Sequence, residues 1–206
     1  MPCPAVNHVK ARTTMKEDRK FDPRSIDKLN NPARFERENP DVVWKELGLR
    51  DPRVLVDIGA GTGFFAIPFS RKGAGITVHA CDLQDEMLAW LREHLPADVR
   101  ERVLPVKMEE TRVPLPDGIA DLVYMINLHH ELEDPAAIMA ESFRLLRKGG
   151  TVLVMDWKKG DTPSGPPQEI RVTVKQIRKD IGTAGFVDIR EHPVLPYHTF
   201  VTGKKP

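Results

Sequence analysis

The sequence predicts an α/β protein with a doubly wound, mostly parallel sheet and helices on both faces. Short apolar runs alternate with helical patterns through most of the 206 residues, and this alternation is typical of parallel sheets that are covered on both sides. The apolar run 54–58 leads directly into the glycine-rich turn "GAGTG". A glycine-rich turn between the first strand and the helix behind it is typical of ligand sites in such sheets.

The first half of the chain carries clear start and stop signals for its elements. Asn31 and Pro32 form a typical cap and first helical position, Gly48 ends a helical pattern, and Pro68 should kink a helix. The apolar residues that follow Asp85 fall on one helical face. We therefore expect a short helix from Asn31, a helix over 41–48, a strand over 54–58, a helix over 64–72, a strand over 76–81 and a helix over 85–95.

The second half of the chain continues the alternation. Asp134 is a typical cap for a helix that Gly149 and Gly150 end, and Thr173 with Gln176 predicts a capping box. We expect strands over 103–106, 121–128, 151–156, 187–192 and 197–202, and helices over 134–147 and 173–185. With the two earlier strands, the predicted sheet has seven strands.

Composition narrows the partners of the protein. The formal net charge is +1, so we expect no general attraction to nucleic acid or to a membrane surface. No apolar run approaches the roughly 18 residues of a membrane span, and the N-terminus lacks the apolar core of a signal peptide. We therefore expect a cytoplasmic protein without stable membrane association. Cys3 and Cys81 are the two cysteines, which is too few for a disulfide framework or a metal cluster.

The glycine-rich turn discriminates between two ligand classes. A dinucleotide site requires G-x-G-x-x-G, but Phe64 occupies the sixth position here. The sequence instead has D-x-G-x-G-x-G over 57–63. Asp57 would repel an anionic diphosphate and attract a ligand that carries an ammonium and a sulfonium group. A nicotinamide-dependent oxidoreductase on a related fold stays open as an alternative.

The segment "VDIGAGTGFF" resembles the first motif of class I S-adenosylmethionine (SAM)-dependent methyltransferases. Segments similar to the family's later motifs follow in order, "HACDLQDEML", "VKMEETRVPLPDGIADLVYMINLHHELEDP" and "RLLRKGGTVLVMDW", so the resemblance covers about residues 40–206. It implies a Rossmann-like, seven-stranded sheet with an antiparallel last strand. It also implies a methyltransferase domain over 41–206, behind an N-terminal extension over 1–40 that forms a substrate lid. Within the class, the chain is similar to the quinone and arsenite methyltransferases.

The resemblance places the SAM site at the ends of the first four strands. Asp57 should meet the amino group of SAM, and Asp82 should accept hydrogen bonds from both ribose hydroxyls. The alternative for Asp82 is a helix cap, a role that Asp85 should fill better. The full set of expected SAM-binding residues is Asp57, Gly59, Ala60, Gly61, Thr62, Gly63, Asp82, Leu83, Met108, Glu109, Asn127 and Leu128.

The segment "NLHHELED" contains the candidate catalytic residue. His129 and His130 are adjacent, so on a strand their side chains would point apart, and the H-E-x-x-H spacing of zinc sites is absent. We therefore expect no metal. His130 could act as a general base toward a hydroxyl or amine. The alternative is that His130 only packs around SAM and that alignment alone supplies catalysis.

The proline-rich stretch 156–171 follows the fifth predicted strand and should form one wall of the substrate pocket, with Asp156, Trp157 and Arg171 as candidate pocket residues. A plain connection would rarely be so long. Residues 21–37 are the second expected cover of the pocket.

The methyl acceptor is not named by the sequence. Arsenite enzymes rely on several cysteines, whereas Cys3 and Cys81 occupy different surroundings, so arsenite is disfavoured. A small soluble metabolite is the default expectation. The oligomeric state is open, and a protein that binds SAM without catalysis remains an alternative to an enzyme.

Overall fold

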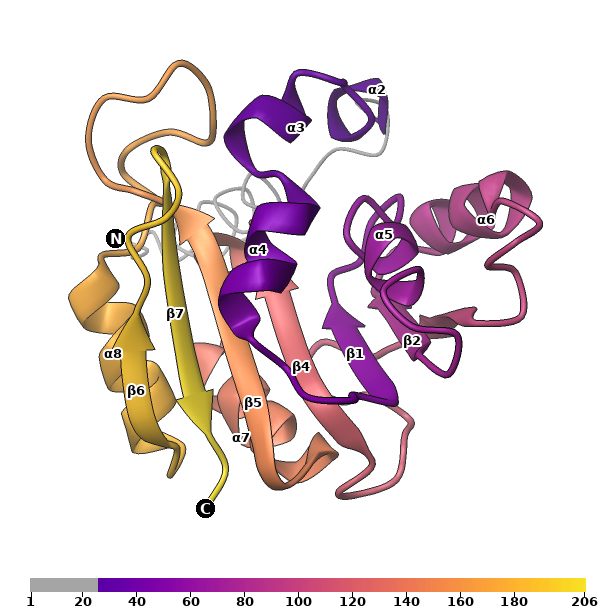
Figure 1. Ribbon diagram of the computed structural model, residues 1–206. Helices are drawn as coiled ribbons and strands as arrows, with labels where there is room; N and C mark the ends of the chain where they lie inside the picture. Colours follow the sequence, from indigo (N-terminus) through magenta and orange to yellow (C-terminus); the bar gives the residue numbers. More distant parts are fainter. Residues whose placement is uncertain (1–25) are drawn as a thin grey trace, which may run out of the picture.

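The computed structural model describes residues 26–206 and arranges the strands of this part in one seven-stranded sheet of order β3-β2-β1-β4-β5-β7-β6 (Figure 1). Strands β1 to β5 run parallel, and β7 runs antiparallel to both β5 and β6. The predicted mostly parallel sheet with an antiparallel last strand is confirmed. The strands are β1 Val54–Ile58, β2 Thr77–Asp82, β3 Val103–Lys107, β4 Ala120–Ile126, β5 Leu146–Trp157, β6 Val187–Glu191 and β7 His198–Lys204.

Helices cover both faces of the sheet, as predicted. On one face, Val43 of α4 and Phe69 of α5 are fully buried in one apolar core. On the other face, Ile138 of α7 and Ile177 of α8 belong to a second core. The helices are α2 Ile26–Leu29, α3 Arg34–Arg37, α4 Pro40–Leu47, α5 Ala66–Ser70, α6 Asp85–His94, α7 Pro135–Leu145 and α8 Val174–Thr183, with a 3-10 turn η2 at His129–Glu131.

Local signals in the sequence explain where several elements begin and end. Gly48 closes α4 in the left-handed conformation, with φ of 56°. The side chain of Asp134 accepts from the amide of Ala137 at the start of α7. The side chain of Thr173 accepts from the amide of Gln176 at the start of α8. These caps satisfy amides that a helix leaves unpaired at its first turn.

Several predicted boundaries are wrong; for example, β5 was expected over 151–156 but begins at Leu146, and β4 ends at Ile126 rather than at 128. Helix α5 begins only at Ala66, because the glycine turn extends through Phe65; Pro68 then stands in the first turn, where its missing N–H is not needed, so the longer kinked helix does not form. Helix α7 stops at Leu145, since β5 already starts at the next residue. The short helix α3 starts after Ala33 rather than after Asn31.

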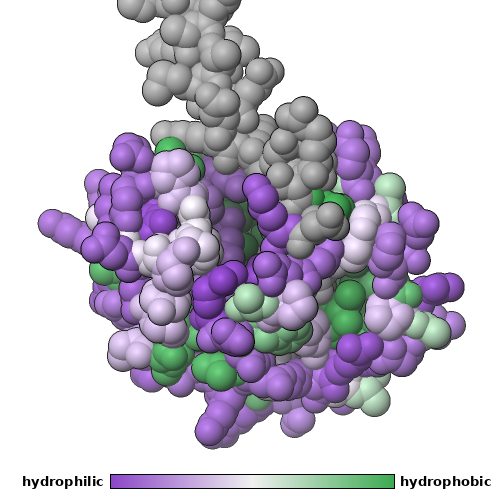
Figure 2. Space-filling model, turned by 90° about the horizontal axis from the view of Figure 1, so that it is seen from above, coloured by the Kyte–Doolittle hydropathy of each residue, from purple (hydrophilic) through white to green (hydrophobic). Residues whose placement is uncertain are grey.

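The fold gathers the candidate site at one end of the sheet. The carboxyl ends of β1, β2, β4 and β5 meet there, and α2, α3 and the loop 158–173 lie at the same end (Figure 1). Seen from above, the described surface at this end is mainly hydrophilic, with separate hydrophobic areas (Figure 2). No helix in the described range is long and apolar enough to cross a membrane. The first 25 residues of the expected extension and lid, which include Cys3, lie outside the described residues.

Candidate functional site

A cavity of about 560 Å³ opens at the carboxyl ends of the central strands. This volume lies within the range of small-molecule sites. One side of the cavity is formed by the turn after β1 and the ends of β2 and β4. The other side is formed by α2, α3, η2 and loop residues 164–166. Together with Met108 and Glu110 after β3, segments from six separate parts of the chain share one ligand-sized space.

The glycine turn brings the main chain close to the cavity. Gly61 has φ of 53°, and a Cβ at this position would contact Leu29 of α2 at 3.4 Å. Gly63 has φ of 79°, and a Cβ there would lie 2.7 Å from Leu91 of α6. Gly61 is thus bare where the cavity and α2 meet, whereas Gly63 is bare because α6 packs against the turn.

Asp57 is a buried carboxyl group at the end of β1. Its side chain is only 3% exposed. Burial raises the pKa of Asp57 from 3.8 to about 8; the neighbouring Tyr124 opposes this shift and the charge of Asp82 adds to it. Because a carboxylate without a cation is costly in such surroundings, this position favours a ligand that brings a positive charge.

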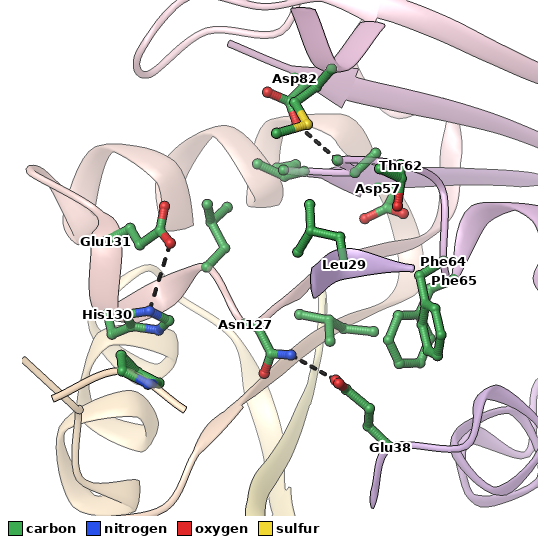
Figure 3. A pocket seen from close by; sticks show the side chains of 18 of the residues that line it. Leu29, Glu38, Asp57, Thr62, Phe64, Phe65, Asp82, Asn127, His130 and Glu131 are labelled. Carbon is green, nitrogen blue, oxygen red and sulfur yellow. Dashed lines mark hydrogen bonds and ion pairs between the residues drawn. The ribbon is translucent and has the colours of Figure 1, made fainter. Parts of the chain in front are cut away.

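Asp82 ends β2 on the opposite side of the glycine turn (Figure 3). One carboxylate oxygen accepts from the amide of Gly61 at 2.8 Å, and the other accepts from the amide of Gln84 at 2.9 Å. Burial raises the pKa of Asp82, while these two amides and the charge of Lys107 oppose the rise. Each oxygen of a carboxylate can accept a second hydrogen bond, so Asp82 fixes the glycine turn and retains capacity for a ligand.

His130 lies in the η2 turn and is held by a buried carboxylate of β5. Its Nδ1 lies 2.8 Å from Oδ1 of Asp156, whose other oxygen accepts from the amide of His130 at 2.9 Å. Burial by itself would lower the pKa of His130, but the hydrogen bond to Asp156 and the charges of Asp156 and Glu131 raise it above 6.5. With Nδ1 bonded to Asp156, Nε2 is the nitrogen left for a ligand; it also lies 3.7 Å from Glu131 (Figure 3).

A second buried carboxylate joins α3 to the end of β4. Glu38 is 1% exposed and lies 2.7 Å from the Nε of Arg34. The amide nitrogen of Asn127 donates to Glu38 at 2.6 Å (Figure 3). The guanidinium of Arg34 also stacks 3.9 Å from the ring centre of Phe64 in the glycine turn. These contacts hold α3 against the glycine turn and β4.

Comparison with known proteins places this site in a family. Residues 56–154 match the family described as "Methyltransferase domain". The crystal structure of a SAM-dependent methyltransferase from Aquifex aeolicus matches with a TM-score of 0.83 and 33% identity, covering 89% of this chain and 98% of that protein. The chain belongs to the class I SAM-dependent methyltransferases. This membership decides against the nicotinamide oxidoreductase.

Two further comparisons show how far the similarity to known proteins extends. The ubiquinone/menaquinone biosynthesis C-methyltransferase UbiE of Pasteurella multocida is 32% identical over 124 residues, covering 57% of this chain and 46% of the relative. This chain spans about half the length of several curated relatives that it matches. The [4+2]-cyclase SpnF matches with a TM-score of 0.66 at 19% identity, covering 81% of this chain and 80% of that protein. The latter likeness concerns the fold alone.

The residues of the cavity fit SAM. Asp57 offers a carboxylate to an ammonium group, and Asp82 has spare acceptor capacity for hydroxyls. Leu83 and Met108 supply apolar surface for a flat ring. The hydroxyl of Thr62 is buried without a hydrogen-bond partner in the described range, so this turn has an unmet polar group that a ligand would satisfy.

Most of the predicted SAM-binding residues of the methyltransferase line the cavity; two do not, and one predicted helix cap is wrong. Gly63 does not line it, because this glycine accommodates Leu91. Glu109 is exposed and does not line it, whereas Glu110 does. Asp85 is not the cap of α6; the cap position is Gln84, and Asp82 accepts from its amide. The predicted residues that line the cavity are Asp57, Gly59, Ala60, Gly61, Thr62, Asp82, Leu83, Met108, Asn127 and Leu128.

Of the three predicted substrate-pocket residues, only Trp157 lines the cavity. Asp156 is fully buried behind it, since both of its oxygens bond to the main chain and ring of His130. Arg171 is buried too, because its guanidinium donates to the carbonyls of Pro166 and Lys158 in the preceding loop. Asp156 and Arg171 therefore do not line this cavity themselves.

The two histidines diverge as expected, although from a 3-10 turn rather than a strand. The Nε2 of His129 lies 3.0 Å from Asp180 of α8, while His130 turns to Asp156. Among residues 26–206, no group of three or more His, Cys, Asp or Glu side chains could hold a metal ion.

Burial raises the pKa of the Cys81 thiol well above its ordinary range.

The sequence did not identify which side chains of α2 and α3 line the cavity. Leu29, Arg34, Arg37 and Glu38 line it together with Phe64. The sequence did predict that residues 21–37 form a cover, but no motif identified which side chains face inward. The i, i+4 spacing of Arg34 and Glu38 indicates an ion pair. The same spacing is typical of exposed pairs on helix surfaces, so it does not predict that Glu38 is buried.

Proposed function

We propose that the protein transfers the methyl group of SAM to a small-molecule acceptor, with His130 as the general base. The observation that carries this proposal is one cavity that joins Asp57 and Asp82 at one end to the His130–Asp156 pair at the other. When bound, SAM supplies an activated sulfonium methyl group. The role of the chain is to align the two reactants, which can account for most of the rate of such a displacement.

The geometry of His130 suits proton removal from a hydroxyl or amine. Asp156 accepts from Nδ1, so neutral His130 keeps a lone pair on Nε2. When Nε2 takes the proton of the acceptor, the resulting imidazolium is stabilised by the buried carboxylate of Asp156 and by nearby Glu131. A thiol acceptor would need this base much less.

We also propose that the segment up to residue 40 acts as a substrate lid over a methyltransferase domain that comprises 41–206. Leu29 lies where a Cβ on Gly61 would touch it, and Asn127 donates a hydrogen bond to Glu38; both observations support this proposal for the described part of the segment.

Binding and transfer can be tested separately. S-adenosylhomocysteine (SAH), the product of SAM-dependent transfer, should raise the melting temperature of the protein, and NAD should not. Transfer of a labelled methyl group from SAM should then be screened over small hydroxyl, amine and thiol compounds. Binding of SAH without transfer to any compound class would favour the non-catalytic alternative. A shift with NAD alone would contradict the proposal.

A further inference from the structure

The α2–α3 side of the cavity carries an excess of positive charge. Among the described side chains of this wall, Lys28, Arg34 and Arg37 line the cavity together with one carboxylate, that of Glu38. Arg34 is fully engaged, because it pairs with Glu38 at 2.7 Å and donates to the carbonyl of Leu29. The charge of Arg34 is thus balanced by Glu38. Arg37 is the other guanidinium of this wall that could bind a ligand.

Arg37 has an unmet hydrogen-bonding group in the cavity wall. Its Nε is buried and has no hydrogen-bond partner among the described side chains, and Arg37 lines the cavity. A buried N–H that lacks an acceptor is costly. The charge of Arg37 also reaches the buried His198: burial lowers the pKa of His198 to about 4, Glu38 and Asp156 oppose this, and Arg34 and Arg37 add to it.

Acidic side chains elsewhere in the cavity disfavour an anion. Asp82, Glu110 and Glu131 also line the cavity, and Asp82 and Glu131 lie away from Glu38 (Figure 3). An anionic group on a ligand would therefore be directed toward the α3 wall. Phe64, Phe65 and Trp157 add aromatic, apolar groups to the cavity lining. These features together describe a ligand with an apolar body and one anionic end.

We propose that the methyl acceptor is a small carboxylic acid with a flat apolar body, and that Arg37 binds its carboxylate. A guanidinium matches the geometry of a carboxylate with two parallel hydrogen bonds. This inference rests on the proposed function, because the ligand is taken to occupy the part of the cavity beside the SAM site.

Benzoate and 2-naphthoate, each compared with its neutral amide, are suitable probes. Their affinities should be measured by ligand-observed NMR in the presence of saturating SAH, for the native protein and for Arg37→Met, Arg37→Lys and Arg92→Met. Arg92 is an exposed residue of α6 and serves as the matched control. SAH affinity should be measured for all four proteins by calorimetry.

We expect the native protein and Arg92→Met to bind each carboxylate at least tenfold more tightly than its amide. Arg37→Met should abolish this preference, Arg37→Lys should keep part of it, and SAH affinity should change less than twofold. Equal affinities for acid and amide, a preference that survives Arg37→Met, or the absence of any carboxylate binding would overturn the proposal. The same titrations without SAH test the role of Arg37 independently of SAH. If SAH does not bind at all, that failure contradicts the proposed function and not the role of Arg37.

Discussion

The side-chain amide of Asn127 donates to the carboxylate of Glu38 at 2.6 Å, and this bond joins the end of β4 to a segment 89 positions earlier in the chain. Because Arg34 holds the other oxygen of Glu38 at 2.7 Å, both oxygens of a buried carboxylate are engaged. Asn127 has φ of 57°, a conformation that asparagine tolerates better than most residues. The α3 segment is therefore fixed to the sheet through a polar contact inside the site.

Removal of Glu38 should loosen this segment. Glu38→Ala leaves Arg34 buried without its partner, so we expect the free energy of unfolding to fall by about 3–5 kcal/mol. Glu36→Ala, an exposed residue of the same helix, should change it by less than about 0.5 kcal/mol. Urea unfolding of both variants measures the difference. Equal stability of the two variants would show that the Glu38 contacts do not hold α3 in solution.

The pKa of Asp57 predicts a pH-dependent stability with a definite sign. Its pKa is about 8 in the folded protein and 3.8 ordinarily, so between these values the folded state binds more protons than the unfolded state. This group therefore makes stability fall as pH rises from about 4 to about 8, by up to about 1.4 kcal/mol per pH unit. Asp57→Asn should remove this contribution and stabilise the ligand-free protein more at pH 8 than at pH 5. Urea unfolding of both proteins at the two pH values tests this.

Binding of SAH should favour the ionised form of Asp57, whereas folding without a ligand favours the protonated form. The ammonium group of SAH favours the ionised carboxyl, so at pH 7 we expect binding to release a proton. Calorimetry in buffers that differ in ionisation enthalpy measures this release. Asp57→Asn should bind SAH more weakly and release no proton; unchanged proton release in this variant would assign the effect to another group.

Asp82 should affect both affinity and stability. It accepts from the amides of Gly61 and Gln84, so Asp82→Ala should lower the melting temperature and weaken SAH binding by tens- to about a hundredfold. Asp85→Asn is the matched control, since the side chain of Asp85 is 81% exposed. If calorimetry gives Asp82→Ala the native affinity for SAH, the role of Asp82 is confined to holding the glycine turn.

The His130–Asp156 pair predicts the pH dependence of turnover. A base acts in its deprotonated form, and the pKa of His130 is raised, so the rate should increase with pH through an inflection above about 6.5. Asp156→Asn should move this inflection to lower pH, because burial then dominates. His130→Ala should reduce turnover about 10²–10⁴-fold with SAH affinity retained.

His129→Ala is the control for this pair, since the ring of His129 turns to Asp180 instead. We expect its pH–rate profile to keep the inflection of the native enzyme. Near-native turnover of His130→Ala on a hydroxyl or amine acceptor would remove the base from the mechanism and leave alignment alone.

Arg171 should hold the loop that forms one cavity wall. Its guanidinium donates to the carbonyls of Pro166, Lys158, Gly160 and Ser164 at 2.8 to 3.4 Å. We expect Arg171→Met to expose the loop to trypsin at Lys158 while SAH affinity is retained. Arg178→Met, an exposed position of α8, should be cleaved at the native rate. Loss of SAH binding in Arg171→Met would show that the loop supports the whole site.

The sequence by itself determined the sheet and the part of the cavity that the glycine turn and Asp82 line. Strand β1 matches its predicted bounds, because a mostly apolar run is buried on both faces of a parallel sheet. The glycine turn and Asp82 could be placed because the carboxyl ends of parallel strands meet at one edge. Local information was sufficient here, since these residues lie at strand ends and in a turn, which the sequence pattern identifies.

Only the tertiary structure decided which side chains complete the site. Asp156 turns behind the cavity to His130, and Arg171 turns to its own loop. Glu38 and Arg37 enter the cavity wall from a short helix whose sequence looks like an ordinary charged surface. Their surroundings come from residues about 90 positions away, such as Asn127. The direction of such a side chain depends on packing and desolvation across these distant contacts, which spacing along the chain does not encode.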